Sequence, residues 1–500
     1  MIGKSGIDII EFCEDLANKR KEEIRNTSDD IEIKGISYYV SSDGNDENDG
    51  RSPETAWKSL SRVSKAELSV GDGVRFRRGD VFRGNVAARS GVTYTAYGIG
   101  EKPRIYCGDR NMADEGLWEL VDELHHIWKY ARKITDCGTL VFDDGARHSR
   151  KLIPSYKNGR FVCRYDENKA FDIKEEMTEN LDIFCSYADN FTVVPSKGEC
   201  FPVPAMCNSC FGDLYLRCDE GNPGKVFETI EAIPWLCAFS VGENYNVWID
   251  NITIKYAKFG VSAEGKEVKG LKITNCEIGW IGGNIQNYLG CDPNYPQGRR
   301  GSVTRYGNAI EIYGGCDGYE VSGCYIYQCY DAGITHQITT NGDKYLLKNI
   351  LYKDNIVEDC VYSIEYFLEK NKADDDSRIE NCEICNNLLR RSGYGWGQQR
   401  HNVDTPAHIK GWSYDNTAQS FSIHHNIFDR AAYRMIHTVS KYKDSCPVMY
   451  ANTYVQKKGL MLGQYGENCE SEPPMLVFDE NVSNTIKEQL CEEDAEVFII

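Results

Sequence analysis

The chain has 500 residues, which is longer than a single hydrophobic core usually organises. Of these residues 41% are hydrophobic, an ordinary fraction for a globular protein. We therefore expect two or three domains, or one elongated repeat architecture. Its 76 acidic and 57 basic residues give a formal net charge of −19, which argues against nucleic acid or an anionic membrane as a partner.

The 21 cysteines are scattered, odd in number and without the spacing of a disulfide scaffold. Residues 1–22 lack the apolar stretch of a signal peptide, and no run approaches the ~18 apolar residues of a membrane span. We expect a reduced, cytoplasmic protein whose cysteines are mostly buried. Zinc is an alternative only at the close pairs Cys207/Cys210 and Cys382/Cys385, where further ligands are not well placed. The sequence therefore predicts no metal site.

The first segment, residues 1–34, is predicted to hold an amphipathic helix. Its apolar positions recur with a helical period, at Ile9, Ile10, Cys13, Leu16 and Ala17. We expect this helix to cap one end of the body, with an oligomer contact as the alternative.

Residues 36–57 predict a strand, a turn rich in Asn, Asp and Gly, and a helix start. Together with residues 71–83 and 91–98 they resemble the opening coil of right-handed parallel β-helix proteins of the pectate-lyase-like superfamily. The resemblance implies first β-helix coils over residues 35–110, and many such proteins are glycoside hydrolases or polysaccharide lyases. The acidic run 43–49 could bind Ca²⁺, but tight turns need the same residues, and we favour the turn.

The pattern changes over residues 111–236, where short strand-like runs alternate with polar turns. We expect an inserted β-rich subdomain there. It would either line one wall of a substrate cleft or serve as inert cover.

Residues 237–500 repeat one unit, a polar or small residue followed by a branched or aromatic pair. The shortest spacing between successive units is 25 residues, which fits one β-helical coil, and the longer spacings fit coils with loop insertions. An Asn at a coil corner tolerates left-handed backbone geometry and can hydrogen-bond along its own column. We therefore predict an all-β protein with a right-handed parallel β-helix as its main body. The repeated positions are Asn251, Cys276, Cys324, Asn355, Asn387, Asn426 and Asn452.

When these units are aligned, one branched residue per coil should point inward and the residue after it outward. The inward residues are Val261, Ile310, Ile334, Ile364, Ile409 and Ile436. The outward residues are Ser262, Glu311, Thr335, Glu365, Lys410 and His437. An outward column that mixes two carboxylates with other polar groups is unusual for a solvated face and indicates a site.

Glu311 and Glu365 are the predicted catalytic pair. Since one coil separates them, their backbones should lie about 9–10 Å apart. This favours an inverting glycosidase, in which one carboxyl protonates the leaving oxygen and the other activates water. Asp331, at the start of the middle strand, is the substitute if one of the two glutamates is structural. The alternative reading of either glutamate is a solvated surface residue, because a single exposed Glu on a strand is usually only solvated.

Further side chains near the acids are candidates for substrate binding. Trp396 could stack on a sugar ring, and Gln398 could hydrogen-bond its hydroxyls. The alternation turns His336 inward, where a core histidine is expected rather than a catalyst, whereas His408 and His437 are placed outward. The complete set is Thr335, His336, Gln337, Trp396, Gln398, Arg400, His408, Lys410 and His437.

Residues 305–312, 330–337 and 362–367 most resemble hydrolytic β-helix enzymes, which implies that the central coils carry the acids. The leading hypothesis is an intracellular, exo-acting glycoside hydrolase for short oligosaccharides that needs no cofactor, with Ca²⁺ not expected. The first alternative is a polysaccharide lyase or uronate epimerase with Lys410 or Arg400 as base and Ca²⁺ on a substrate carboxylate. The second is a glycan-binding β-helix without catalysis, and a homo-oligomer remains open.

Overall fold

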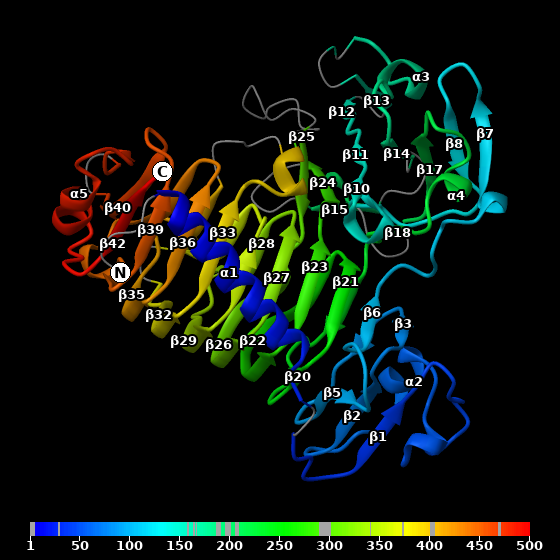
Figure 1. Cartoon of the computed structure of the whole chain (residues 1–500), viewed down its shortest axis with the longest axis horizontal. Coiled ribbons are helices and arrows are strands. Elements are labelled where there is room, and N and C mark those ends of the chain that lie inside the picture. The colour runs from blue at the N-terminus through cyan, green and yellow to red at the C-terminus, as the bar shows by residue number, and fades with distance from the viewer. Residues whose placement is uncertain are drawn as a thin grey trace.

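The computed structural model describes residues 6–28, 31–157, 160–163, 166, 168–186, 192–195, 202–205, 210–289, 302–340, 342–372, 375–400, 406–468 and 472–500. The body is a right-handed parallel β-helix, whose coils stack along the long axis of the molecule (Figure 1). From β4 (Val86–Ala87) to β39 (Thr453–Gln456), each coil contributes one strand to each of three parallel sheets, and β22 (Phe259–Thr274) and β26 (Ile310–Ser322) are long enough to bend from the first sheet into the second.

The first sheet carries the predicted acids. It consists of β4 (Val86–Ala87), β19 (Cys237–Ser240), the first part of β22 (Phe259–Thr274), the first part of β26 (Ile310–Ser322), β28 (Ala332–Thr339), β31 (Tyr362–Glu369), β34 (Ala407–Gly411), β37 (Arg434–Ser440) and β40 (Met461–Glu467).

The second sheet contains the strand that follows each first-sheet strand from β4 to β37 along the chain, and it begins with two strands that precede β4. It consists of β1 (Ser37–Val40), β2 (Gly73–Arg77), β5 (Thr93–Tyr97), β20 (Trp248–Asp250), the second parts of β22 and β26, β29 (Leu346–Lys353), β32 (Arg378–Cys385), β35 (Ala418–His424) and β38 (Val448–Tyr450).

The third sheet closes each coil. It consists of β3 (Val81–Arg83), β6 (Arg104–Tyr106), β21 (Thr253–Ala257), β23 (Glu277–Ile281), β27 (Tyr325–Cys329), β30 (Ile356–Glu358), β33 (Leu388–Ser392), β36 (Ile427–Ala431), β39 (Thr453–Gln456) and β42 (Glu496–Ile499).

The predicted inward column is confirmed. Val261 pairs with Ile310, and the pairing continues strand by strand to Ile436. All six side chains are buried in the apolar interior that the three sheets enclose. Burying a branched side chain of this size stabilises the fold by about 1.5–3 kcal/mol, so the stacked column fixes the register of every coil.

The corner between the second and third sheets carries a ladder of asparagines. Asn355, Asn387, Asn426 and Asn452 are buried, and each donates from Nδ2 to a side-chain oxygen of the next coil at 2.9–3.1 Å. The predicted hydrogen bonding along the column is therefore confirmed. The left-handed backbone, however, belongs to the residue before each of these four, as at Asp354 with φ 58°. Asn251 also has a left-handed backbone, with φ 59°, but its Nδ2 donates to the carbonyls of Thr27 and Ser28 rather than along the column.

The predicted N-terminal helix is present as α1 (Gly6–Arg25). It lies lengthwise along the third sheet rather than across the end of the stack (Figure 1). Ile9 and Cys13 pack against Val455 in a late coil, and Arg25 Nε donates to Glu277 in an early one at 2.8 Å. The helix therefore ties several coils together along one side.

The segment between β6 and β19 leaves the stack and forms further sheets of its own (Figure 1). Trp118, Ile183, Leu214 and Phe227 belong to a separate apolar cluster. The described strands and short helices are η2 (Glu115–Leu117), β7 (Trp118–Asp122), β8 (Ile127–Tyr130), β9 (Leu140–Phe142), η3 (Asp143–Gly145), β10 (Arg147–His148), β11 (Arg150–Lys151), β12 (Ser155–Lys157), β13 (Arg160–Val162), α3 (Ile173–Glu176), β14 (Asp182–Ser186), β15 (Thr192–Pro195), β16 (Pro202–Ala205), β17 (Asp213–Arg217), α4 (Pro223–Val226) and β18 (Ile230–Ala232).

The remaining elements are short additions to the stack. They are η1 (Pro53–Thr55), α2 (Leu60–Lys65), β24 (Asn284–Leu289), β25 (Ser302–Tyr306), η4 (Trp396–Gln399), η5 (Lys443–Ser445), β41 (Leu476–Val477) and α5 (Val482–Gln489). No helix in the described parts of the chain is long and apolar enough to span a membrane.

The acidic run 43–49 forms the tight turns that we favoured over a calcium loop. Asp46 accepts the backbone N–H groups of Lys58 and Ser59, and Asp49 accepts that of Arg51. These carboxylates therefore hold the turn and the start of α2.

Candidate active site

The outward residues of the first sheet form one continuous column, which we call the acid face: Ser262, Glu311, Thr335, Glu365, Lys410 and His437. The predicted register is confirmed at each step, and Gln464 of β40 extends the column by one coil. Adjacent parallel strands are about 4.8 Å apart, so the backbones of Glu311 and Glu365 are separated by about 9–10 Å.

The acid face is much less exposed than an open sheet surface, contrary to our expectation of a solvent-facing column. Glu311 is 8% exposed, Glu365 is 5% exposed and Lys410 is 3% exposed. Burial strengthens the electrostatic interactions of these groups and shifts their pKa values.

Glu311 is held by two amide donors. Asn308 Nδ2 and Gln337 Nε2 donate to Glu311 Oε2, at 2.6 and 2.9 Å. Burial raises the pKa of Glu311 to about 7, although the hydrogen bond from Asn308 and the charge of Lys258 oppose this shift. Thr335 completes the group, because its hydroxyl donates to Gln337 Oε1 at 3.0 Å and so orients the amide.

Asp331 and Glu365 form the second half of the acid cluster. Asp331 forms an ion pair with Arg400, which opposes the rise in the Asp331 pKa that burial causes. Burial, and after it the charge of Asp331, raise the pKa of Glu365 well above its usual range. Since the ion pair with Arg400 stabilises the ionised form of Asp331, Glu365 is the one of these two carboxyls favoured to hold a proton.

The far end of the acid face is cationic. Arg434 lies against His437, with Nη1 and Nδ1 3.0 Å apart, and it also donates to Gln464 at 3.4 Å. Burial, with the charges of Lys410 and Arg434, lowers the pKa of His437 to about 2, so the ring is neutral. Neutral imidazole beside two cations suits hydrogen bonding to a sugar hydroxyl better than proton transfer.

Two aromatic side chains remain accessible beside the acids. Tyr306 and Trp412 are each 37% exposed, and Lys410 Nζ lies 4.1 Å from the centre of the Trp412 ring. Both rings could stack on the apolar face of a sugar.

Two predicted binding residues, Trp396 and His408, are buried away from the acid face. Trp396 is buried, where its Nε1 donates to the Gln328 carbonyl and its ring lies against Tyr330, so the predicted stacking platform is wrong. His408 is also buried rather than outward, because Ser363 and the Arg430 carbonyl bind its two nitrogens.

His336 lies in the core, as the alternation indicated, and its inclusion among the binding residues is wrong. Its ring stacks on Tyr366, and its Nδ1 lies 2.8 Å from the Tyr352 hydroxyl. Gln398 is exposed at the surface, and its amide donates to the carbonyl of Tyr394 within the same loop.

The burial of His336 predicts a pH-dependent loss of stability. Burial lowers its pKa to about 3, so between about pH 6.5 and 3 the unfolded chain binds a proton there that the folded chain does not. The contribution of His336 to stability is therefore lost as the pH falls, by about 2 kcal/mol from pH 7 to pH 5. Urea unfolding at both pH values should show a smaller loss for His336→Phe than for the wild type. The exposed His148→Phe is the control and should behave as the wild type; an unchanged slope in His336→Phe would contradict the assignment.

Lys258 is a site residue that the sequence analysis missed. It is buried directly before β22, and its Nζ lies 3.2 Å from the centre of the Trp235 ring. Burial lowers the pKa of Lys258 to about 8. Lys258 stands three residues before Val261, just as Asp331 stands three residues before Ile334. The alignment that identified Asp331 could therefore have identified Lys258.

Asn308 was missed as well, although it lies only three residues before Glu311. The alignment considered side chains within the strands, whereas Asn308 bonds to Glu311 from the preceding turn and also accepts the N–H of Ala332 at 2.9 Å. It therefore links the acid to the neighbouring coil.

No family model and no curated protein matches this chain. Among solved structures it resembles XylC in complex with xylose, at 12% identity and a TM-score of 0.43, over 93% of this chain and 83% of the other. It also resembles a GH136 lacto-N-biosidase from Eubacterium ramulus, at 13% identity and a TM-score of 0.39, over 99% and 71%. A third is a rhamnogalacturonan lyase, at 9% identity and a TM-score of 0.37, over 86% and 78%. At these values the similarities decide neither substrate nor reaction.

Proposed function

We propose that this protein is a glycoside hydrolase that acts on short oligosaccharides and inverts the anomeric configuration. The observation that carries the proposal is a pair of carboxyls, Glu311 and Glu365, two coils apart on one buried face. A backbone separation of about 9–10 Å suits the 6.5–9.5 Å between carboxyls that inverting enzymes use to admit a water.

In this proposal Glu365 is the general acid. Its raised pKa keeps the proton that the leaving glycosidic oxygen needs. Glu311 is the general base, because two amide donors stabilise its ionised form and direct one of its oxygens. Glu311 would take a proton from the attacking water as Glu365 gives one to the leaving group. After one turnover Glu311 is therefore protonated and Glu365 ionised, and before the next Glu311 must release a proton to solvent and Glu365 must take one up.

The same assignment sets the expected pH dependence. The base must be ionised, so turnover should rise as the pH increases through the pKa of Glu311, about 7. The acid must be protonated, so turnover should fall again where Glu365 loses its proton. The bell-shaped profile therefore has its acidic limb near neutral pH.

The proposed preference for short substrates and exo cleavage rests on the burial of the acids. A long chain lying in an open groove would need the acid face to be accessible along its length, whereas Glu311 and Glu365 are nearly covered. Tyr306 and Trp412 would then hold one terminal sugar. The cysteine-rich composition favours a reducing compartment for this activity.

A polysaccharide lyase or uronate epimerase is the second candidate, favoured by the cations on this face. Lys258, with its pKa lowered to about 8, and Lys410 could act as bases or bind a uronate carboxylate. Arg400 is unsuited to the role of base, because its ion pair with Asp331 holds the guanidinium charge. A lyase would produce an unsaturated uronate with strong ultraviolet absorbance.

The test is a panel of aryl glycosides and short oligosaccharides, offered to the wild type, to Glu365→Gln and to Glu369→Gln. Glu369 is on the same strand as Glu365 but is exposed, so its variant controls for the loss of a charge. We expect the wild type and Glu369→Gln to hydrolyse the oligosaccharides at similar rates, and Glu365→Gln to hydrolyse them about 10²–10⁴-fold more slowly. Tight glycan binding with no product from any member would support a binding protein instead.

The variant Asp331→Asn tests whether Asp331 acts only as a charge that raises the pKa of Glu365 or is itself a catalytic acid or base. Removing the Asp331 charge should lower the pKa of Glu365 and shift the alkaline limb of the profile down by about one pH unit, with turnover at the optimum reduced less than tenfold. Asp317→Asn, on the second sheet, is the matched control. Loss of turnover by orders of magnitude at every pH would instead make Asp331 a catalytic acid or base.

A further inference from the structure

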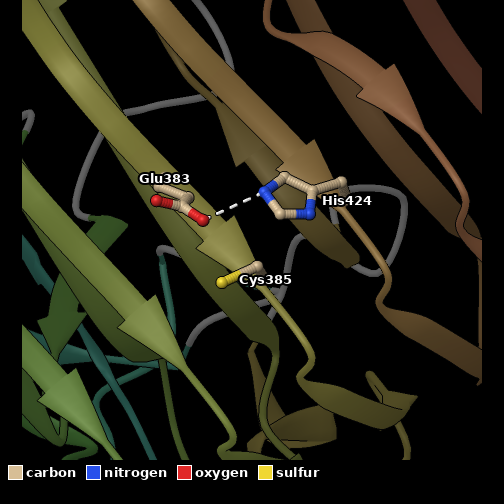
Figure 2. A group of neighbouring side chains, drawn as sticks. All are labelled: Glu383, Cys385 and His424. Atoms are coloured by element: carbon tan, nitrogen blue, oxygen red, sulfur yellow. Dashed lines mark hydrogen bonds and ion pairs between the residues drawn. The ribbon is translucent and has the colours of Figure 1, made fainter.

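A second group of chemically active side chains lies on the outer side of the second sheet. Cys385, the last residue of β32, pairs directly with His424, the last residue of β35. Glu383 stands two residues before Cys385 and therefore projects from the same side of the sheet. Figure 2 shows the three side chains gathered on these neighbouring strands, with Glu383 Oε1 and His424 Nε2 3.1 Å apart.

The three residues offer a thiol, an imidazole and a carboxylate at metal-ligand distances. Their ligand atoms all lie within 4.8 Å of one another. Bond lengths of about 2.0–2.3 Å place ligands around a tetrahedral zinc ion about 3–4 Å apart, so small side-chain rotations close the site.

The imidazole of His424 is oriented as a metal ligand requires. Its Nδ1 lies 2.8 Å from Nδ1 of His425, so one of these nitrogens carries the proton of a hydrogen bond. Without an ion, the contact with Glu383 needs a proton on His424 Nε2, because a carboxylate only accepts, and His424 Nδ1 then accepts from His425. When a cation replaces the Nε2 proton, Nδ1 donates to His425 and the electron pair of Nε2 binds the ion. Metal-bound histidines commonly use their second nitrogen in this way, which fixes the tautomer and the plane of the ring. Tyr450 packs on the other side, with its ring stacked on His424 at 4.3 Å.

The pocket around these residues has room for an ion and its water. Its volume is about 370 Å³, against about 30 Å³ for a water molecule in the liquid, and it is also lined by Leu351, Lys353, Asn386 and His425. Lys353 opposes a cation, but it is 45% exposed and lies 3.7 Å from Asp354, so solvent and this carboxylate screen its charge.

We propose that Glu383, Cys385 and His424 bind a zinc-class divalent cation, with water as the fourth ligand and His425 holding His424 in position. Thiolate and imidazole ligands select zinc over calcium or magnesium. The ligands come from two successive coils, so the bound ion would cross-link β32 and β35. It lies on a different sheet from the acid face and is independent of the proposed hydrolase function.

Cys382 and Cys385, one of the two close cysteine pairs at which the sequence leaves zinc as an alternative, cannot share an ion. Residues three apart on a strand point to opposite sides, so Cys382 lies in the core while Cys385 faces outward. Cys207 lies outside the described residues. The partners of Cys385 come instead from its own strand and from the next coil, 39 residues along the chain.

The proposal is tested by titrating the chelator-treated protein with Co²⁺, which reports thiolate ligation by an intense ultraviolet charge-transfer band and tetrahedral geometry by its visible bands. We expect one equivalent to bind, to be displaced by Zn²⁺, and to raise the melting temperature, since the ion binds only the folded state. Cys385→Ser should abolish the charge-transfer band, and His424→Asn should reduce the affinity by at least 100-fold. His425→Gln should reduce it by about 10–100-fold, as expected for a residue that orients a ligand.

Cys491→Ser and His148→Asn are controls, because both side chains are exposed and distant in sequence from the site. Circular dichroism and thermal melting without metal check that each variant folds. Absence of the charge-transfer band in the wild type would overturn the proposal. So would a band of the same intensity in folded Cys385→Ser, because the thiolate ligand would then be another cysteine.

Discussion

Glu365→Gln is expected to lower the turnover of a cognate glycoside by about 10²–10⁴-fold, the contribution of a positioned general acid. The amide keeps the shape of the side chain but cannot protonate the leaving oxygen. Substrates with very acidic leaving groups, such as dinitrophenols, need no such proton and should lose much less activity.

This dependence on the leaving group identifies an acid rather than a merely structural residue. Glu369→Gln, on the same strand, should retain wild-type turnover with both kinds of substrate. Near-normal turnover by Glu365→Gln on the natural glycoside would remove Glu365 from the mechanism. An equal loss for all leaving groups would show that Glu365 does not act as the acid.

Glu311→Gln is expected to cause a loss of similar size, about 10²–10⁴-fold, but with every leaving group. The variant cannot take a proton from the attacking water. Azide, a nucleophile that has no proton to lose, should partly restore turnover and form a glycosyl azide of inverted configuration.

The acidic limb of the pH profile of turnover, which lies near neutral pH, should also disappear in Glu311→Gln, because the pKa of about 7 belongs to this carboxyl. Glu320→Gln, in the part of the same strand that joins the second sheet, is the matched control and should keep both the limb and the turnover. Persistence of the limb in Glu311→Gln would assign it to another group, for which Asp331 is the nearest candidate.

The register of the β-helix could be predicted because it depends on local alternation. One branched residue per coil must enter the core, and a slip by one residue would expose the whole set, so the inward positions fix the outward ones. The column from Ser262 to His437 was correct for this reason.

The burial of the acid face could not be predicted in the same way. It depends on residues outside the aligned strands, such as Arg400, which reaches Asp331 from 69 residues away in sequence. The same limit explains the errors at Trp396 and His408, whose buried partners, the Gln328 and Arg430 carbonyls, lie 68 and 22 residues away in sequence.

The group of Glu383, Cys385 and His424 was missed for a related reason. The alignment followed the strands of the first sheet, whereas these residues belong to the second. The repeated Asn positions would have supplied the register there too, because Cys385 and His424 each stand two residues before a ladder asparagine, Asn387 and Asn426. Searching every outward column for ligand types, rather than one, would have found the pair.

The most direct test of the proposed hydrolase is proton NMR of the wild-type reaction during the first turnovers on a cleaved oligosaccharide. The first sugar released should carry the anomeric configuration opposite to that of the bond cleaved, before mutarotation mixes the two forms. Release of the same configuration would contradict the water-admitting arrangement of Glu311 and Glu365. Signals of an unsaturated uronate would show that the protein is a lyase instead.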